Sequence, residues 1–235
     1  MQALIKQIHD LGKTKGVVSG NFRIVGDTTL TGISRADDSK ANLDQYKAQF
    51  DPVIKFFAAG IKVANGPTTK DGFTSADILD ATKGACQKKS PLNCALDTKP
   101  AVVFIVVGHN DIAAKIPLAQ LSTNLTKAVS AAEAVGTIPV LVTITGAPKG
   151  ANEAQVAQYN QMIYNVAKAT QIPLFNLYRV RGENPALIDP ATGRLTDRSD
   201  KQLDLSPKGL QFGVNVIALH MLDLLSALEN AVPLG

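Results

Sequence analysis

Two continuous apolar runs, "VVFIVV" at residues 102–107 and "VLVTI" at 140–144, constrain the fold most strongly. Strands that are apolar throughout are typical of a parallel sheet covered by helices on both faces. We predict further strands at "FRIVG" (22–26) and "IPLFNL" (172–177), and a weak one at "IKVA" (61–64). Because connections between parallel strands are right-handed, the pattern predicts an α/β protein, a three-layer α/β/α sandwich with a central parallel sheet.

The segments between these strands carry helical signals. The sequence predicts a helix that opens at "FTSADILD" and others at about 42–58, 118–135, 153–170 and 207–228. Ser206 and Pro207 are typical of an N-cap and a first helical residue. Residues 181–205 are polar and long for a connection, so we expect a surface loop, with a short hairpin at "LIDPATGRL".

Length and composition fit one domain over residues 1–235 that buries a sizeable core: 45% of the residues are hydrophobic and 19% are charged. No apolar run approaches the roughly 20 residues that cross a bilayer, so we expect no membrane span. The formal charge of +4 comes from scattered basic residues with acids interleaved, as in 194–201. We interpret these charges as solvated surface and expect no nucleic-acid partner. The sequence does not indicate an oligomeric state.

The two cysteines, Cys86 and Cys94, flank a proline-containing loop. Two thiols without a neighbouring histidine are poor material for a zinc site, and their spacing is not that of a redox motif. We expect a loop-closing disulfide worth about 2 to 3 kcal/mol, and therefore an extracellular or cell-surface location. Two unpaired thiols in a cytosolic loop are the alternative. The opening residues fit an amphipathic helix and lack the apolar core of a signal peptide, so an internal start is one interpretation.

Four short blocks fall where strands end or helices begin: "GDT" (26–28), "TKDGFT" (69–74), "VVGHND" (106–111) and "DLSPKG" (204–209). With a parallel sheet they meet at its carboxyl edge, where ligands bind. In order and spacing the blocks resemble those of the SGNH, or GDSL-like, hydrolases. The stretch "CQKKSPLNCALDTKPAVVFIVVGHND" is similar to the extracellular branch of that superfamily. The resemblance implies the flavodoxin-like SGNH-hydrolase fold and an ester-hydrolase ancestry, without a cofactor.

The resemblance also implies a role for each block: a nucleophilic serine, two oxyanion donors from a glycine and an asparagine, and an Asp-x-x-His base. Gly72 and Asn110 match the donors. Thr28 stands where the serine belongs, and its methyl group restricts and crowds the hydroxyl. Aligned on "LSPKG", the histidine position falls on Asp204 and the aspartate position on Lys201. A carboxylate is a much weaker base than an imidazole at neutral pH, so both substitutions indicate impaired catalysis.

Other polar residues at this edge allow two interpretations. His109 precedes Asn110, and alternation along a strand predicts that it faces away if Asn110 faces the cleft. Asp27 and Asp111 follow strand-ending glycines, where aspartates commonly bond turn amides, and we favour that structural role. We keep Asp27 and His109 as candidate ligand-binding residues. The spacing of the acidic and amide residues matches no metal loop, so we predict no metal site.

The sequence is therefore compatible with two functions. In the first, the chain is a pseudoenzyme that keeps the fold and the cleft and serves as a binding or structural module for a glycan or an acylated small molecule. In the second, it is an active esterase on small or carbohydrate-linked esters, in which Thr28 works with Asp204 or a water as a weak base. Two substitutions in the catalytic blocks favour the first.

Overall fold

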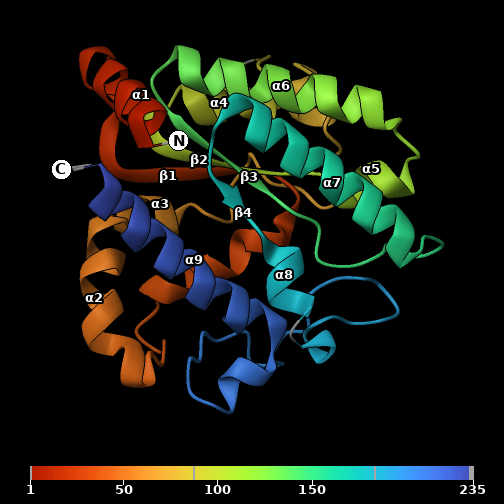
Figure 1. Cartoon of the computed structure of the whole chain (residues 1–235). Coiled ribbons are helices and arrows are strands. Elements are labelled where there is room, and N and C mark those ends of the chain that lie inside the picture. Colours follow the sequence, from red (N-terminus) through yellow and green to blue (C-terminus); the bar gives the residue numbers. More distant parts are fainter. Residues whose placement is uncertain (1, 87, 183, 233–235) are drawn as a thin grey trace.

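A parallel sheet of four strands forms the centre of the molecule (Figure 1). The computed structural model describes residues 2–86, 88–182 and 184–232. The strands lie in chain order and are β1 (Val18–Gly26), β2 (Pro100–Val106), β3 (Ile138–Val142) and β4 (Leu174–Phe175). Gly26 pairs with Val106 and Val106 with Val142, so the first three strands end level with one another. Their carboxyl ends form the edge that carries the four motif blocks of the sequence.

Strand β2 explains why the apolar runs are continuous. Val102, Phe104 and Val106 belong to one hydrophobic core, and Val103 and Ile105 belong to the other. Successive side chains of a strand point to opposite faces, so a strand between two cores needs apolar residues at every position. The predicted three-layer sandwich with a parallel sheet is confirmed.

Helices cover both faces of the sheet (Figure 1). Residues of α1, α2, α3 and α9 build one core with the sheet, and residues of α4, α5, α6 and α7 build the other. The helices of the first group are α1 (Gln2–Lys15), α2 (Lys47–Phe56), α3 (Ala58–Lys62) and α9 (Gly213–Ala231). Those of the second are α4 (Pro91–Leu96), α5 (His109–Ala113), α6 (Leu118–Ala134) and α7 (Glu153–Thr170), and α8 (Leu177–Gly182) follows β4.

The predicted weak strand at 61–64 is wrong, because this segment consists of the last residues of α3, which ends at Lys62, and the turn that follows. Ile61 and Ala64 are buried, whereas Val63 is 37% exposed. A spacing of three buries both residues on one helical face, whereas a strand would have buried Ile61 and Val63 together. The chain meets β1 only later, through a single parallel bridge between Thr69 and Gly26.

Two predicted helix starts also differ from the structure. At "FTSADILD" the backbone makes only a short 3₁₀ turn, Asp77–Leu79, although Thr74 and Asp77 exchange the expected capping hydrogen bonds. The last helix begins at Gly213 and not at Pro207. The Ser206 hydroxyl accepts a hydrogen bond from the Gly209 amide at 3.3 Å, which closes a turn in place of a helical N-cap. Local capping chemistry was therefore present at both places, but no regular helix follows it directly.

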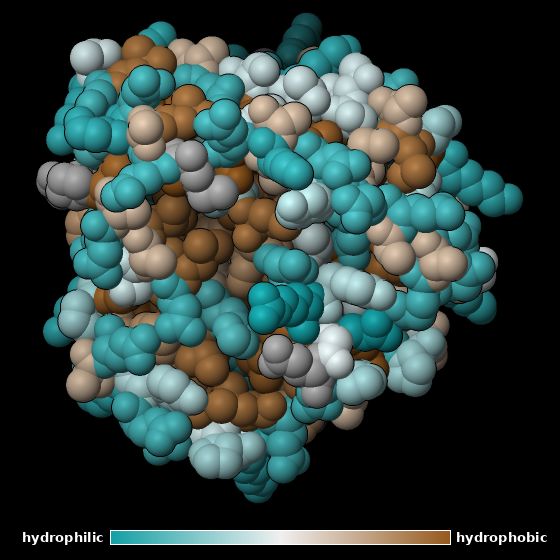
Figure 2. All heavy atoms as spheres, viewed as in Figure 1, coloured by the Kyte–Doolittle hydropathy of each residue, from teal (hydrophilic) through white to brown (hydrophobic). Residues whose placement is uncertain are grey.

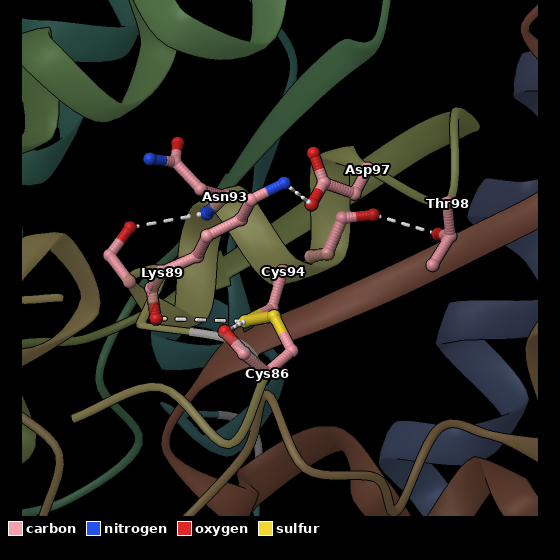
Figure 3. The surroundings of a disulfide bond; sticks show 8 residues. Cys86, Lys89, Asn93, Cys94, Asp97 and Thr98 are labelled. Carbon is pink, nitrogen blue, oxygen red and sulfur yellow. Dashed lines mark hydrogen bonds and ion pairs between the residues drawn. A yellow bond between two sulfur atoms is a disulfide. The ribbon is translucent and has the colours of Figure 1, made fainter. Parts of the chain in front are cut away.

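The loop before β2 is closed by a disulfide between Cys86 and Cys94 (Figure 3). Helix α4 starts beside it, where the Ser90 hydroxyl accepts a hydrogen bond from the Asn93 amide at 3.2 Å. The predicted disulfide is thus present in the structure. The predicted hairpin within 181–205 is present as well, with a bridge between Ile188 and Leu195.

Figure 2 shows hydrophobic residues gathered in a hollow between α7 and α9, over the edge strand β4. Tyr164, Ile172 and Leu174 line a pocket near the amino end of β4. It therefore lies away from the edge that carries the motif blocks. In the part of the chain that the structure describes, no helix combines the length and apolar character needed to cross a membrane.

Candidate functional site

The first three motif blocks meet where β1 and β2 end. The Asp27 amide donates a hydrogen bond to the Val106 carbonyl at 2.7 Å, and the Lys70 amide donates to the Gly26 carbonyl at 2.9 Å. Gly26 has a φ of 112°, and a β-carbon there would lie 2.1 Å from the Val106 oxygen. Only glycine fits so close to the neighbouring strand. The chain is therefore forced into one path as it leaves the sheet, and that path fixes Asp27.

Asp27 is the centre of the site. Its side chain is 2% exposed. It accepts hydrogen bonds from the Thr29 amide (3.0 Å), the Thr29 hydroxyl (2.6 Å) and Asn110 Nδ2 (2.8 Å). Arg194 Nη1 lies 3.2 Å from both carboxylate oxygens. The bond to the Thr29 amide is the turn role that the sequence favoured. The bonds to Asn110 and Arg194 go further, because they join three separate segments around one buried carboxylate.

The Asn110 amide uses both of its hydrogens inside the protein. One hydrogen bond goes to Asp27 Oδ2 at 2.8 Å and the other to the Phe73 carbonyl at 3.0 Å. An oxyanion donor must point at the place where negative charge develops on the substrate. In this arrangement the Asn110 side chain is instead part of the scaffold that holds the second and third blocks together.

Gly72 lies on the loop of the second block and has a φ of 92°, with open space beside it. The buried carboxylate of Asp111 fixes this loop. It accepts hydrogen bonds from the Ser75 amide (3.0 Å), the Ser75 hydroxyl (2.5 Å) and the Gly108 amide (2.9 Å). Burial raises the pKa of Asp111 above its usual range, and these hydrogen bonds oppose the shift. Nothing in the sequence pattern singled out Ser75 as the partner that connects the two blocks.

His109 starts α5, so it does not follow the strand alternation assumed from the sequence. Its Nδ1 lies 3.2 Å from the Gly146 carbonyl oxygen and donates to it. The ring lines a small cavity together with Asp27 and Thr29. Burial, followed by the positive charge of Arg194, lowers the pKa of the His109 imidazole below its usual range. The ring is therefore neutral at pH 7 and lies closer to Asp27 than the alternation argument predicted.

Thr28 lines a second cavity of about 270 Å³ at the start of the fold's first 3₁₀ segment. Charged side chains line it as well: Arg35 from the same 3₁₀ segment, and Arg194, Asp197 and Lys201 from the long loop before α9. Arg35 holds Asp197 through two hydrogen bonds of 2.7 and 2.8 Å, and Lys201 Nζ lies 2.8 Å from the same carboxylate. Burial opposes ionisation, but the bonds from Arg35 and Lys201 lower the pKa of Asp197 to about 2.

Asp204 does not share this cavity. Its carboxylate accepts hydrogen bonds from Arg198 Nη1 (2.6 Å), Asn42 Nδ2 (3.0 Å) and the Ser206 amide (3.0 Å). Burial acts to raise the pKa of Asp204, but the bonds from Ser206 and the charge of Arg198 outweigh it and lower the pKa. The structure therefore brings Thr28 together with Lys201, and it holds Asp204 against the loop that contains Asn42.

The sequence missed the part that residues 194–201 play. These charges were interpreted as solvated surface, but the side chains of Asp197 and Arg198 are only 18% and 20% exposed. Arg194, at the end of the hairpin, pairs with Asp27 through Nη1 and with Asp71 through Nη2. The alternation of opposite charges in a long loop was the available signal, because such residues can pair with partners elsewhere in the chain.

Comparison with known proteins adds the family to this geometry. A model of the GDSL-like Lipase/Acylhydrolase family matches residues 72–212, which is more than half of the chain. The chain belongs to this family. The matched segment contains Gly72, Asn110 and Asp204. It begins at residue 72 and therefore does not include Thr28. No curated protein sequence matches this GDSL-like chain at a significant level.

Solved structures of GDSL-like proteins share its fold. A GDSL-like lipase from Bacteroides thetaiotaomicron has 17% identity and a TM-score of 0.56, and the match covers 97% of this chain and 100% of that one. The psychrotrophic esterase EstA from Pseudoalteromonas sp. has 17% identity and a TM-score of 0.53, with 90% and 99% covered. A lipolytic protein of the G-D-S-L family from Desulfitobacterium hafniense has 14% identity and a TM-score of 0.53, with 86% and 98% covered. At these identities the similarity establishes the fold alone.

Proposed function

We propose that this GDSL-like chain is a catalytically impaired member of its family that acts as an extracellular binding module for a glycan or an acylated small molecule. The observation that carries the proposal is the composition of the Thr28 cavity. Among the described residues, the ionisable side chains that line it are Arg35, Arg194, Asp197 and Lys201, with no imidazole. A hydroxyl needs an adjacent base before it can attack an ester.

None of these side chains suits that task. A guanidinium offers only hydrogen-bond donors, so Arg35 and Arg194 do not suit the role of a base, and Lys201 Nζ is engaged by the Asp197 carboxylate. Asp197, whose pKa is about 2, is a weak base at neutral pH. Asp204 is engaged by Arg198 and Asn42, outside the cavity. Loss of a nucleophile or base in a catalytic triad typically lowers the rate by about four to six powers of ten.

The oxyanion donors support the same proposal. The two side-chain hydrogens of Asn110 are used by Asp27 and by the Phe73 carbonyl. A substrate would have to displace these partners before Asn110 stabilised a developing negative charge. Removal of one oxyanion donor costs roughly a hundredfold to a thousandfold in rate in a working hydrolase. The engagement of Asn110 thus favours a fold that is kept for binding, with one of its two oxyanion donors occupied inside the protein.

The disulfide supports the location that we propose. Cys86 and Cys94 are paired, and such bonds persist in oxidising compartments such as the bacterial surface or the extracellular space. A binding module on a surface protein needs a stable scaffold and an open cavity, and it does not need turnover.

An esterase assay tests the proposal directly. We expect the purified protein to hydrolyse p-nitrophenyl acetate and longer p-nitrophenyl esters no faster than buffer, and Thr28→Ala to change nothing. Turnover that disappears in Thr28→Ala, with the thermal unfolding of the variant unchanged, would overturn the proposal and establish an active esterase.

A restoration experiment tests which residue lies near the Thr28 hydroxyl. Sequence alignment puts the histidine position at Asp204, whereas Lys201 lines the cavity. Lys201 lines the Thr28 cavity, lies beside Asp197 and has a φ of 53°, which histidine tolerates. We therefore expect Thr28→Ser with Lys201→His to raise ester hydrolysis about 10-fold above background, well below the contribution of a complete acid–base pair. Thr28→Ser with Asp204→His is the matched comparison and should stay at background. The reverse order would show that residue 204 reaches the hydroxyl.

A further inference from the structure

The side chains that line the Thr28 cavity carry more positive than negative charge. Three cationic side chains and one carboxylate line it, together with the hydroxyl-bearing residues Thr28, Thr29 and Thr31. We propose that the cavity binds a small ligand through a carboxylate group, with Arg194 as the anchor. This inference rests on the proposed binding function and names the ligand class that the site takes.

Arg194 is held in place for such a role. Its Nη1 lies 3.2 Å from both oxygens of the buried Asp27 carboxylate. The hairpin that carries it is fixed by Gly193, whose α-carbon approaches Ala147 so closely that a β-carbon would lie 2.0 Å from the Ala147 oxygen. The guanidinium therefore has one edge fixed inside the protein, while its side chain remains 32% exposed beside the cavity. A planar guanidinium matches a carboxylate with two parallel hydrogen bonds.

The outer edge of Arg194 already binds a carboxylate. Nη2 contacts Asp71, whose side chain is 69% exposed. Asp71 lies on the loop of the second block, next to Gly72, which has open space around it. Exposed ion pairs contribute little free energy, so the Asp71 carboxylate exchanges easily for a carboxylate from a ligand. The Asp71 carboxylate thus occupies the position where the ligand's acid group binds. It competes with that group for Arg194.

Lys201 supplies a second positive charge. Asp197, the carboxylate in the cavity wall, is already neutralised by two hydrogen bonds from Arg35. Lys201 contacts the same carboxylate, but its side chain is 64% exposed and reaches solvent at the mouth. The lysine charge therefore remains available to an anionic ligand in the same cavity as Arg194.

The volume limits the size of the ligand. At about 270 Å³ the cavity lies just below the roughly 300 Å³ at which drug-sized ligands begin to be enclosed. A single sugar ring with an acid group, or a short organic acid, fits this limit. The acidic sugar and the short organic acid both carry a carboxylate. They differ in the hydroxyl groups that they offer to the threonines.

Calorimetric titration at fixed ionic strength tests the proposal with four probes: glucuronate, acetate, glucose and inorganic phosphate. We expect glucuronate to bind and glucose not to bind. Acetate that binds as well as glucuronate would identify a short acid as sufficient, and tighter binding of glucuronate would identify an acidic sugar. Phosphate that binds more tightly than both acids, or glucose that binds as well as glucuronate, would overturn the assignment of a carboxylate.

The decisive variant is Asp71→Asn, because it removes the internal competitor. We expect it to tighten the binding of the carboxylate by about 2- to 5-fold, whereas Asp97→Asn, which breaks the exposed pair with Lys89 far from the cavity, should leave it unchanged. Arg194→Lys keeps a charge beside Asp27, so the fold is preserved, but it removes the fork and should weaken binding at least about 10-fold. An unchanged or weaker affinity in Asp71→Asn would overturn the proposal.

The outcomes of these experiments distinguish a failure of this inference from a failure of the proposed function. Absent binding together with absent ester turnover would remove the carboxylate site and leave the impaired-hydrolase proposal intact. Turnover that depends on Thr28 would remove the impaired-hydrolase proposal, whatever the affinity for glucuronate.

Discussion

The ion pair between Arg35 and Asp197 makes a quantitative prediction about stability. Asp197 accepts two hydrogen bonds from Arg35 and one from Lys201, and its side chain is 18% exposed. It connects the segment after β1 to the long loop before α9, which are 162 residues apart in the sequence. The substitution Asp197→Asn keeps the shape of the side chain and removes the charge.

The pKa of Asp197 gives the magnitude. The pKa falls from 3.8 to about 2 because the bonds from Arg35 and Lys201 outweigh the effect of burial. A shift of this size corresponds to about 2.4 kcal/mol between the two protonation states, at 1.36 kcal/mol per unit. Lys201 is 64% exposed, so solvent screens part of this interaction. We therefore expect Asp197→Asn to lower the free energy of unfolding by about 1 to 2 kcal/mol at pH 7.

The sign of the pH dependence follows from the same shift. The folded-state pKa lies below the unfolded one, so the stabilisation is present above about pH 4 and is lost as the pH falls toward 2. Urea unfolding of the wild type and of Asp197→Asn measures the difference from pH 7 down to pH 3. We expect a constant difference from pH 7 to about pH 5 and about half of it at pH 3. A difference that stays constant to pH 3, or grows, would refute the reasoning.

Two further predictions concern the scaffold. Replacement of both Cys86 and Cys94 by serine should lower the free energy of unfolding by about 2.5 kcal/mol, or the melting temperature by about 5 °C, because it frees a short loop in the unfolded chain. Calorimetry measures it, and a loss below about 0.5 kcal/mol would contradict the loop-closure argument. Asp111→Ala should cost about 2 to 4 kcal/mol, because it leaves the buried Ser75 and Gly108 amides without their acceptor. Hydrogen exchange should then show faster exchange at both amides, and unchanged exchange would count against the role of Asp111.

The sequence predicted the sheet and the long helices because their signals are local. In β2 every residue from Ala101 to Val106 belongs to one of two cores, so the apolar run is continuous and the prediction is unambiguous. Helices α6 and α7 match the predicted ranges to within one residue, since each has a long amphipathic repeat. The short segment at 61–64 gave the wrong answer, because four residues do not distinguish a period of two from a period of 3.6.

The site was less predictable because its contacts are distant in sequence. The blocks placed Asp27, Gly72 and Asn110 at one edge, and the structure brings their segments together there. The Arg194–Asp27 pair joins residues 167 positions apart, and no local pattern specifies such a partner. His109 was misjudged for another reason, because it is the first residue of α5 and the alternation of a strand does not apply to it.

Under the proposed binding function, Asp27 connects the anchor of the ligand to the family's oxyanion donor. The same buried carboxylate orients Arg194 beside the cavity and engages Asn110, so the anchor and the occupied donor share one partner. Freeing Asn110 for an oxyanion would require Asp27 to lose one of its hydrogen bonds, and it would leave Thr29 and Arg194 to compensate the buried charge. Breaking such a buried network typically costs several kcal/mol. The proposed function therefore predicts that Asn110 stays bound to Asp27 when a ligand occupies the Thr28 cavity, with Arg194 as the fixed cationic anchor.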